Sequence, residues 1–219
     1  YSTACTTPLS NFELALNYKD VNDPSVVVKF PLALASGDGA QLLVWTTTPW
    51  TLPANLAVCV NPDFEYVVVR QTDIADSPAY VLLECSMEFV FGKEAGKWSV
   101  VKKVKGSELV GQQYEPMFEF FKDRQTTIKT TFTVLSGSFV SNDSGTGIVH
   151  MAPGFGEDDF QTCLEHGVIT ETDVPCPIDE SGRYIAPVSA DWLLGKYVKD
   201  ADSAIIKDIE ARNRLLWRS

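Results

Sequence analysis

The sequence is poor in the residues that hold metal ions or form disulfides. Its 219 residues include two histidines and five cysteines, and no two cysteines form a C-x-x-C pair. An odd number of scattered cysteines fits free thiols in a reducing compartment better than a disulfide framework, and two histidines argue against a catalytic zinc site. We therefore expect a cytoplasmic chain without a metal site.

Long apolar runs are absent as well. No stretch approaches the roughly 20 apolar residues that cross a membrane, and no basic segment followed by an apolar one resembles a secretory leader. The sequence begins at Tyr1 and ends within an expected helix, so we expect a piece of a larger protein. Residues 1–219 are expected to form one domain, monomeric when isolated and without a membrane partner.

Basic residues are scarce: 18 lysines and arginines stand against 29 aspartates and glutamates, a formal charge of −11. Proteins that bind nucleic acids by themselves usually carry a basic surface, because neutralising phosphates supplies much of their affinity. Taken alone, the charge counts against an RNA partner. Five lysines between residues 93 and 105, opposed by Glu94 alone, leave two interpretations open, a charged edge strand or a contact with an RNA backbone.

Several common catalytic motifs are also missing. The sequence has no G-x-x-x-x-G-K-[ST] phosphate loop, no G-x-S-x-G nucleophile elbow and no H-E-x-x-H metal pair. Gly145 and Gly147 lack the third glycine of a dinucleotide-binding fingerprint. No motif of these classes therefore points to a function.

What the sequence does contain is a series of short β-strands. Runs rich in valine, leucine and tyrosine, separated by turn residues such as those at 36–39, predict strands at 26–30, 41–46, 56–60, 66–70, 80–84, 98–104, 130–135 and 147–151. Helices are expected at 86–95, 157–166 and 200–217, the last as a peripheral helix that packs one face. We predict a β-rich mixed α/β fold with a β-barrel-like core of short strands and peripheral helices.

The first candidate site follows the strand expected at 41–46. Residues 45–55 read WTTTPWTLPAN, so three threonines end the strand before Pro49 stiffens the loop. Hydroxyl groups at a strand end, beside two tryptophans, are what a pocket for a small polar ligand requires. Threonine is also a good strand former, so a site and a purely structural role both remain open.

The second candidate site is the segment 145–160, GTGIVHMAPGFGEDDF. It reads as a glycine turn, a short strand, a loop and a helix start, where the helix dipole favours charged acids at 157–159. A strand–loop–helix path can bring His150 and Asp159 to opposite sides of one pocket. A lone histidine is more often a core residue than a catalyst, but the nearby acids and the glycines, which permit close approach of a ligand, favour a site here.

These two motifs, in this order and about ninety residues apart, resemble the two editing motifs of isoleucyl-tRNA synthetases. The valine and leucine enzymes are similar in fold but carry T-T-R-P in the first motif, whereas this sequence has T-T-T-P at 46–49. The resemblance covers the whole chain and is that of a class I editing (connective-peptide) domain of the eukaryotic cytosolic type. It implies the fold that the valine, isoleucine and leucine editing domains share.

The resemblance implies post-transfer editing, the hydrolysis of the ester in valyl-tRNA(Ile). One missing methylene changes binding by only about 1–3 kcal/mol, so a synthetic pocket admits valine and a second, hydrolytic site must remove it. The expected partners are the 3′ end of tRNA(Ile) carrying valine and the rest of the synthetase. No H-I-G-H and no K-M-S-K-S occurs, so ATP and magnesium would belong to a synthetic domain, and editing needs no cofactor.

The same resemblance gives Asp159 and His150 specific roles. Asp159 matches the aspartate that pairs with the α-ammonium group of the substrate, where the helix dipole would keep it ionised. His150 matches the residue that crowds the extra methyl group of isoleucine. Two mechanisms remain open, a water oriented by Asp159, the threonine backbone and the terminal ribose hydroxyl, or His150 as a general base with an ordinary pKa of about 6.5.

Other positions also match the family. The residues that line the pocket and hydrogen-bond the aminoacyl and ribose groups are the threonines Thr46, Thr47 and Thr48. Asn55 occupies a position important for editing, where it holds the loop. Trp50 and Phe155 offer flat surfaces to the terminal adenine, because bases stack on aromatic rings.

Two other functions fit part of these observations. The same pocket would serve a non-catalytic barrel that binds a small amino acid without cleaving an ester. It would also serve an editing domain specific for another aminoacyl-tRNA. Binding of free valine or norvaline without hydrolysis distinguishes the first, and the T-T-T-P motif argues against the second.

Overall fold

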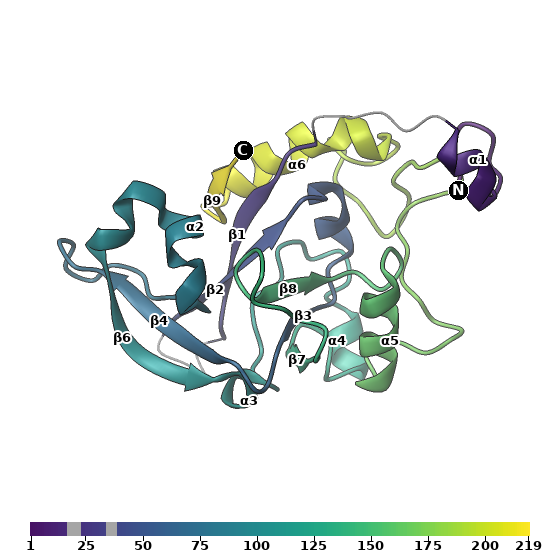
Figure 1. Cartoon of the computed structure of the whole chain (residues 1–219). Helices are drawn as coiled ribbons and strands as arrows, with labels where there is room; N and C mark the ends of the chain where they lie inside the picture. The colour runs from purple at the N-terminus through teal and green to yellow at the C-terminus, as the bar shows by residue number, and fades with distance from the viewer. Residues whose placement is uncertain (17–22, 34–38) are drawn as a thin grey trace.

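The computed structural model describes residues 1–16, 23–33 and 39–219. Its strands form two mixed sheets, one of six strands in the order β6-β4-β5-β2-β1-β9 and one of three in the order β7-β3-β8. Figure 1 shows α2, β4 and β6 at one end of the molecule and α4 and α5 at the other. The β-rich mixed α/β prediction is confirmed, but the described strands lie in two sheets and not in one closed barrel. Residues 36–38 of the turn predicted at 36–39 lie outside the described residues.

The larger sheet forms the centre of the fold. Its strands are β1 (Val26–Pro31), β2 (Gln41–Thr46), β4 (Glu65–Gln71), β5 (Tyr80–Leu83), β6 (Trp98–Lys105) and β9 (Leu215–Arg218). Two hydrophobic clusters cover its two faces, with Leu42 and Val44 of β2 in one and Leu43 in the other. Because alternate side chains of a strand point to opposite faces, burial on both faces explains why the central strands are continuous apolar runs.

The smaller sheet brings the second motif to the first. Its strands are β7 (Val134–Ser136), β3 (Ala57–Val60) and β8 (Ile148–Met151). β8 runs antiparallel to β3, with His150 opposite Val58. β8 also contacts β2 of the larger sheet, so the ends of the two candidate motifs meet where the sheets join.

The helices are short, with one exception. The α-helices are α1 (Asn11–Ala15), α2 (Met87–Phe91), α3 (Gly106–Leu109), α4 (Arg124–Thr127), α5 (Glu157–Glu165) and α6 (Val198–Ala211), and the 3-10 helices are η1 (Pro49–Ala54), η2 (Glu84–Ser86) and η3 (Gly92–Lys97). The helix predicted at 86–95 is broken, because Gly92 has a φ of +52° and α2 ends there. None of the helices among the described residues is long and apolar enough to span a membrane.

The prediction of a helix over 200–217 is wrong at its end. α6 stops at Ala211 and the chain reverses at Asn213, whose φ is +56°. Asparagine tolerates this left-handed conformation better than most residues, and its Oδ1 accepts a hydrogen bond from Lys29 Nζ at 3.0 Å. The following residues form β9, which pairs antiparallel with β1 and places Trp217 opposite Val27.

The lysine-rich segment lies at the edge of the larger sheet. β6 ends the strand order, and most of its side chains are exposed. Lys103 Nζ lies 3.0 Å from carboxylate oxygens of both Glu65 and Glu84. The edge position is confirmed by this strand order, and lysines at an edge oppose pairing with another chain. The contact with an RNA backbone stays a prediction.

Candidate active site

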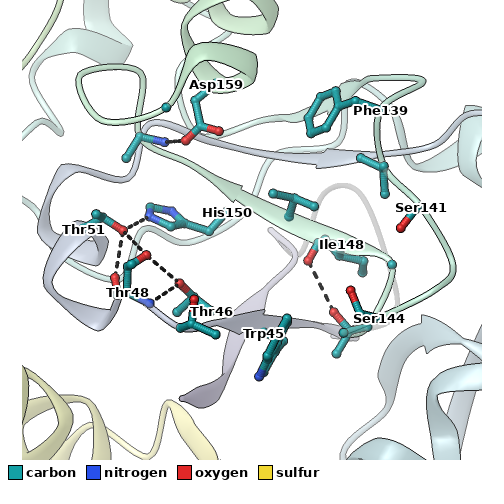
Figure 2. A pocket seen from close by; sticks show the side chains of 18 of the residues that line it. Trp45, Thr46, Thr48, Thr51, Phe139, Ser141, Ser144, Ile148, His150 and Asp159 are labelled. Atoms are coloured by element: carbon teal, nitrogen blue, oxygen red, sulfur yellow. Dashed lines mark hydrogen bonds between the residues drawn. The ribbon is translucent and has the colours of Figure 1, made fainter. Parts of the chain in front are cut away.

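A pocket of about 400 Å³ lies where β2, β8 and the start of α5 meet (Figure 2), a size typical of small-ligand sites. Both candidate motifs line it, together with residues between 139 and 144 that sequence analysis did not single out. The structure brings six of the predicted site residues to its wall: Thr46, Thr47, Thr48, His150, Phe155 and Asp159. Trp50 and Asn55 are not among the lining residues.

The threonine motif forms a compact network of hydroxyl groups after β2. Thr46 is buried, and its Oγ1 accepts a hydrogen bond from the Thr48 amide at 3.1 Å. Thr51 Oγ1 donates to the Thr48 carbonyl at 2.9 Å, which holds the first turn of η1. Thr47 is exposed. The motif therefore presents hydroxyls from a closed turn with defined hydrogen bonds, and not from a free strand end.

His150 is buried in the wall of the pocket, and both of its ring nitrogens contact neighbouring side chains. Its Nε2 lies 2.9 Å from Thr51 Oγ1, and its Nδ1 lies 2.8 Å from Asn55 Nδ2. Burial lowers the pKa of His150 to about 4, because a buried imidazolium loses its hydration. The ring is therefore neutral at physiological pH. Asn55 contacts this ring and is buried behind the pocket.

Asp159 lies in the first turn of α5, across the pocket from the threonines (Figure 2). Its Oδ2 accepts a hydrogen bond from the Ala152 amide at 2.8 Å. Burial raises the pKa of Asp159, the Ala152 amide partly opposes this, and the charge of Asp158 raises it further. The helix-start position led us to expect stabilised charge, but the loss of hydration outweighs the dipole. A Cβ at Gly156 would lie 3.0 Å from Asp159 Cγ, so glycine makes room for the carboxyl group.

The glycine turn before β8 is fixed by close packing. Gly145 and Gly147 have φ angles of +71° and +77°, which favour glycine. A Cβ on Gly145 would lie 2.9 Å from Cε3 of the Trp45 ring. The buried Tyr66 hydroxyl donates to the Gly147 carbonyl at 2.7 Å. The turn therefore allows Trp45 to form one wall of the pocket.

The two aromatic residues predicted to face an adenine play different structural parts. Phe155 lines the pocket, whereas Trp50 packs behind it, with ring centroids 5.1 Å apart at 71°. The hydroxyl of Tyr184 donates a hydrogen bond to the Trp50 carbonyl. Phe155 is therefore the one of the pair that presents a surface to the pocket.

Comparison of sequences gives close relatives over the full length of the chain. It is 48% identical over 221 residues to the cytoplasmic isoleucine–tRNA ligase of Saccharomyces cerevisiae and 43% identical over 218 residues to that of Mus musculus. It is also 43% identical over 219 residues to the isoleucine–tRNA ligase of Chlamydia trachomatis serovar D. These matches cover 99–100% of the chain but 16–20% of the relatives, so the chain spans about a fifth of their length. No protein-family model matches the sequence.

Comparison of structures identifies the fold. The chain superposes on GlLeuRS-CP1 with a TM-score of 0.65 at 17% identity, covering 89% of this chain and 98% of that one. It superposes on the editing domain of P. falciparum cytosolic leucyl-tRNA synthetase with a TM-score of 0.62 at 10% identity, covering 90% and 100%. The chain belongs to the isoleucine–tRNA ligases and has the editing-domain fold.

Sequence analysis missed several residues that shape the pocket of this editing domain. Thr51 lies inside the first motif, and the repeated hydroxyls around Pro49 were a signal for it. Tyr114 donates to Asn55 Oδ1 at 2.6 Å, and no local pattern marks a contact across 59 positions. The wall at 139–144 includes Phe139, Ser141 and Ser144. Among the described residues of the editing domain, no three His, Cys, Asp or Glu side chains are grouped so as to hold a metal ion.

Proposed function

We propose that this editing domain hydrolyses the ester of valyl-tRNA(Ile), as part of a cytoplasmic isoleucine–tRNA ligase. The observation that carries the proposal is that Asp159 and His150 both line a pocket bounded by threonine hydroxyls. An aminoacyl ester carries a cationic ammonium group and a side chain of defined size. The pocket offers a carboxylate for the first and a neutral, immobile ring that limits the second.

Asp159 is proposed to bind the α-ammonium group. The Ala152 amide holds Oδ2, and among the described residues no side chain donates a hydrogen bond to this carboxylate, which leaves Oδ1 for the substrate. A charged hydrogen bond between ammonium and carboxylate is stronger than a neutral one, and partial burial strengthens it further. The arriving ammonium would also stabilise the ionised carboxylate against the burial that raises its pKa.

His150 is proposed to exclude isoleucine by its bulk and not to act as a base. A general base needs a free lone pair and a pKa near the working pH. The His150 pKa of about 4 is far below neutrality, and both ring nitrogens lie within hydrogen-bond distance of protein side chains. A fixed ring suits steric exclusion, because an extra methyl group then meets a wall that does not yield.

Water is the proposed nucleophile. Two buried cysteines, Cys59 and Cys163, are close enough to feel the charge of Asp159. Burial, together with that charge, raises the pKa of each thiol to about 12. Thiols so rarely ionised are inert. We propose that Asp159, the backbone around Thr47 and Thr48, and the terminal ribose hydroxyl orient a water toward the ester carbonyl, which the neighbouring ammonium activates.

The proposed partners are the 3′ end of tRNA(Ile) carrying valine and the remainder of the ligase. With a formal charge of −11, the domain would draw most of its affinity for tRNA from outside this chain. Editing as proposed uses no cofactor, and ATP and magnesium would serve the synthetic reaction elsewhere in the ligase. The isolated chain is proposed to be monomeric.

The test is a deacylation assay on the full-length ligase, with valyl-tRNA(Ile) and isoleucyl-tRNA(Ile) as substrates. Asp159→Ala should lower valyl-tRNA hydrolysis by about a hundredfold, because loss of a buried charged contact costs about 2–3 kcal/mol. Asp158→Ala is the matched control, since Asp158 is exposed in the same helical turn, and should change the rate less than twofold. Equal effects of both changes, or none, would refute the assignment.

The same assay separates the other two functions. A pocket that only binds an amino acid would take up free valine or norvaline and leave the ester intact. An editing domain for another aminoacyl-tRNA would hydrolyse that ester faster than valyl-tRNA(Ile).

A further inference from the structure

The backbone carbonyl of Ala57 fixes the direction of the buried hydrogen bonds around His150. Asn55 Nδ2 lies 2.8 Å from the Ala57 carbonyl. A carbonyl only accepts, so the neighbouring end of the Asn55 amide must be the NH2 group. Its second N–H then points to His150 Nδ1, 2.8 Å away, which must be the unprotonated nitrogen. The proton of the neutral ring is therefore on Nε2.

The other side of the ring fits the same tautomer. His150 Nε2 lies 2.9 Å from Thr51 Oγ1, and with the proton on Nε2 it donates to that oxygen. The Thr51 hydroxyl then donates its own proton to the Thr48 carbonyl at 2.9 Å. Every hydrogen bond around the ring is therefore satisfied in the tautomer that Asn55 requires.

Tyr114 completes this chain of hydrogen bonds, which we call the relay. Its side chain is almost fully buried, and its hydroxyl donates to Asn55 Oδ1 at 2.6 Å. We propose that Tyr114 is a positioning residue for the discrimination between valyl and isoleucyl esters. It holds the Asn55 amide, which in turn holds the His150 ring in one tautomer and one orientation at the pocket wall. The predicted effect of Tyr114 on specificity rests on the proposed editing function. Its predicted effect on the His150 ring does not.

Removal of the Tyr114 hydroxyl should loosen the ring without emptying the core. Tyr114→Phe keeps the aromatic ring, which packs edge-on against Phe30 and Phe132. It leaves Asn55 Oδ1 without its donor, a costly state for a buried group. The Ala57 carbonyl still holds one N–H of the amide, but nothing holds its oxygen, so the amide and the His150 ring that it contacts gain freedom to move.

The first experiment is 15N NMR of the imidazoles in the 219-residue chain. The sequence has two histidines, and His166 is an internal reference, because its Nδ1 lies 2.9 Å from the Thr162 carbonyl and must carry the proton. The wild-type chain should show His150 as the Nε2–H form and His166 as the Nδ1–H form. Any other tautomer of His150 in the wild type overturns the relay, without recourse to a variant.

The second experiment compares Tyr114→Phe with Tyr80→Phe, a buried tyrosine in the hydrophobic cluster on the other face of the larger sheet. Tyr114→Phe should shift or broaden the His150 signals, because the ring is less firmly held, while the His166 signals stay unchanged. In the full-length ligase it should raise the ratio of isoleucyl- to valyl-tRNA hydrolysis about tenfold. Tyr80→Phe should change neither.

The outcomes separate this inference from the proposed function. A Tyr114→Phe ligase with the wild-type ratio, or a chain with the wild-type His150 signals, overturns the role of Tyr114. A wild-type ligase that hydrolyses neither ester overturns the proposed function, and the tautomer of His150 still decides whether the relay exists.

Discussion

At the scale of single residues, the site combines an unfavourable charge with a locked neutral ring. Asp159 loses hydration and its pKa is raised, whereas His150 loses hydration and its pKa is lowered. Both shifts disfavour charge, because burial removes the hydration of each charged form. The proposed ammonium group of the substrate would give Asp159 a partner and so link binding to ionisation.

Truncation of His150 should widen the specificity of the site. In His150→Ala the ring proposed to limit side-chain size is gone, so isoleucyl-tRNA hydrolysis should rise at least tenfold while valyl-tRNA hydrolysis falls less than tenfold. Steady-state rates on both esters measure this. A loss of more than a hundredfold on both would instead favour a chemical role.

The pH profile gives an independent test of the same residue. With a His150 pKa of about 4, the wild-type rate should show no inflection near pH 6.5. The sign follows from the shift: the neutral ring is the form favoured by the fold, so its contribution to stability is complete above about pH 6.5 and is lost as pH falls toward 4.

At the scale of elements, the glycine turn before β8 is the most constrained connection at the site. A Cβ on Gly147 would lie 2.3 Å from Leu83 Cγ and Cδ1. Gly147→Ala should therefore destabilise the domain by about 2–3 kcal/mol through crowding and backbone strain. Gly195 is the matched control, since its φ of +75° is similar but nothing lies within 4 Å of an added Cβ. Urea unfolding of the two variants compares them, and equal losses would show that crowding is unimportant.

Some of these elements could be predicted from the sequence and others could not. β2 was predicted residue for residue, because apolar side chains and turn residues mark it locally. The helix was extended to residue 217 because Leu216 falls near the helical spacing of Ile205, Ile206 and Ile209, whereas the reversal at Asn213 depends on pairing with β1. The threonine and histidine motifs were recognisable as strings. The link from Tyr114 to Asn55 was not, because only the fold brings these residues together.

At the scale of the whole molecule, the excess of negative charge should make stability depend on salt. A formal charge of −11 produces repulsion that ions screen, with a Debye length of about 10 Å at 0.1 M salt. The Tm should rise by several degrees between roughly 20 and 300 mM sodium chloride. The eight ion pairs among the described residues are mostly exposed. Salt weakens these pairs too, but the stability lost in this way should be smaller than the stability gained by screening the repulsion. A Tm that falls with salt would contradict this balance.

The pocket lies between strands that belong to different sheets, β2 in the larger and β8 in the smaller. Its breadth therefore depends on how far apart the two sheets are held, as well as on the side chains that line it. Val58 and Leu135 are buried in the smaller sheet and are not among the lining residues, and a change of one methyl group there shifts packing that a dense core transmits. A substitution in the smaller sheet can thus change the breadth of the pocket while every residue that lines it stays the same.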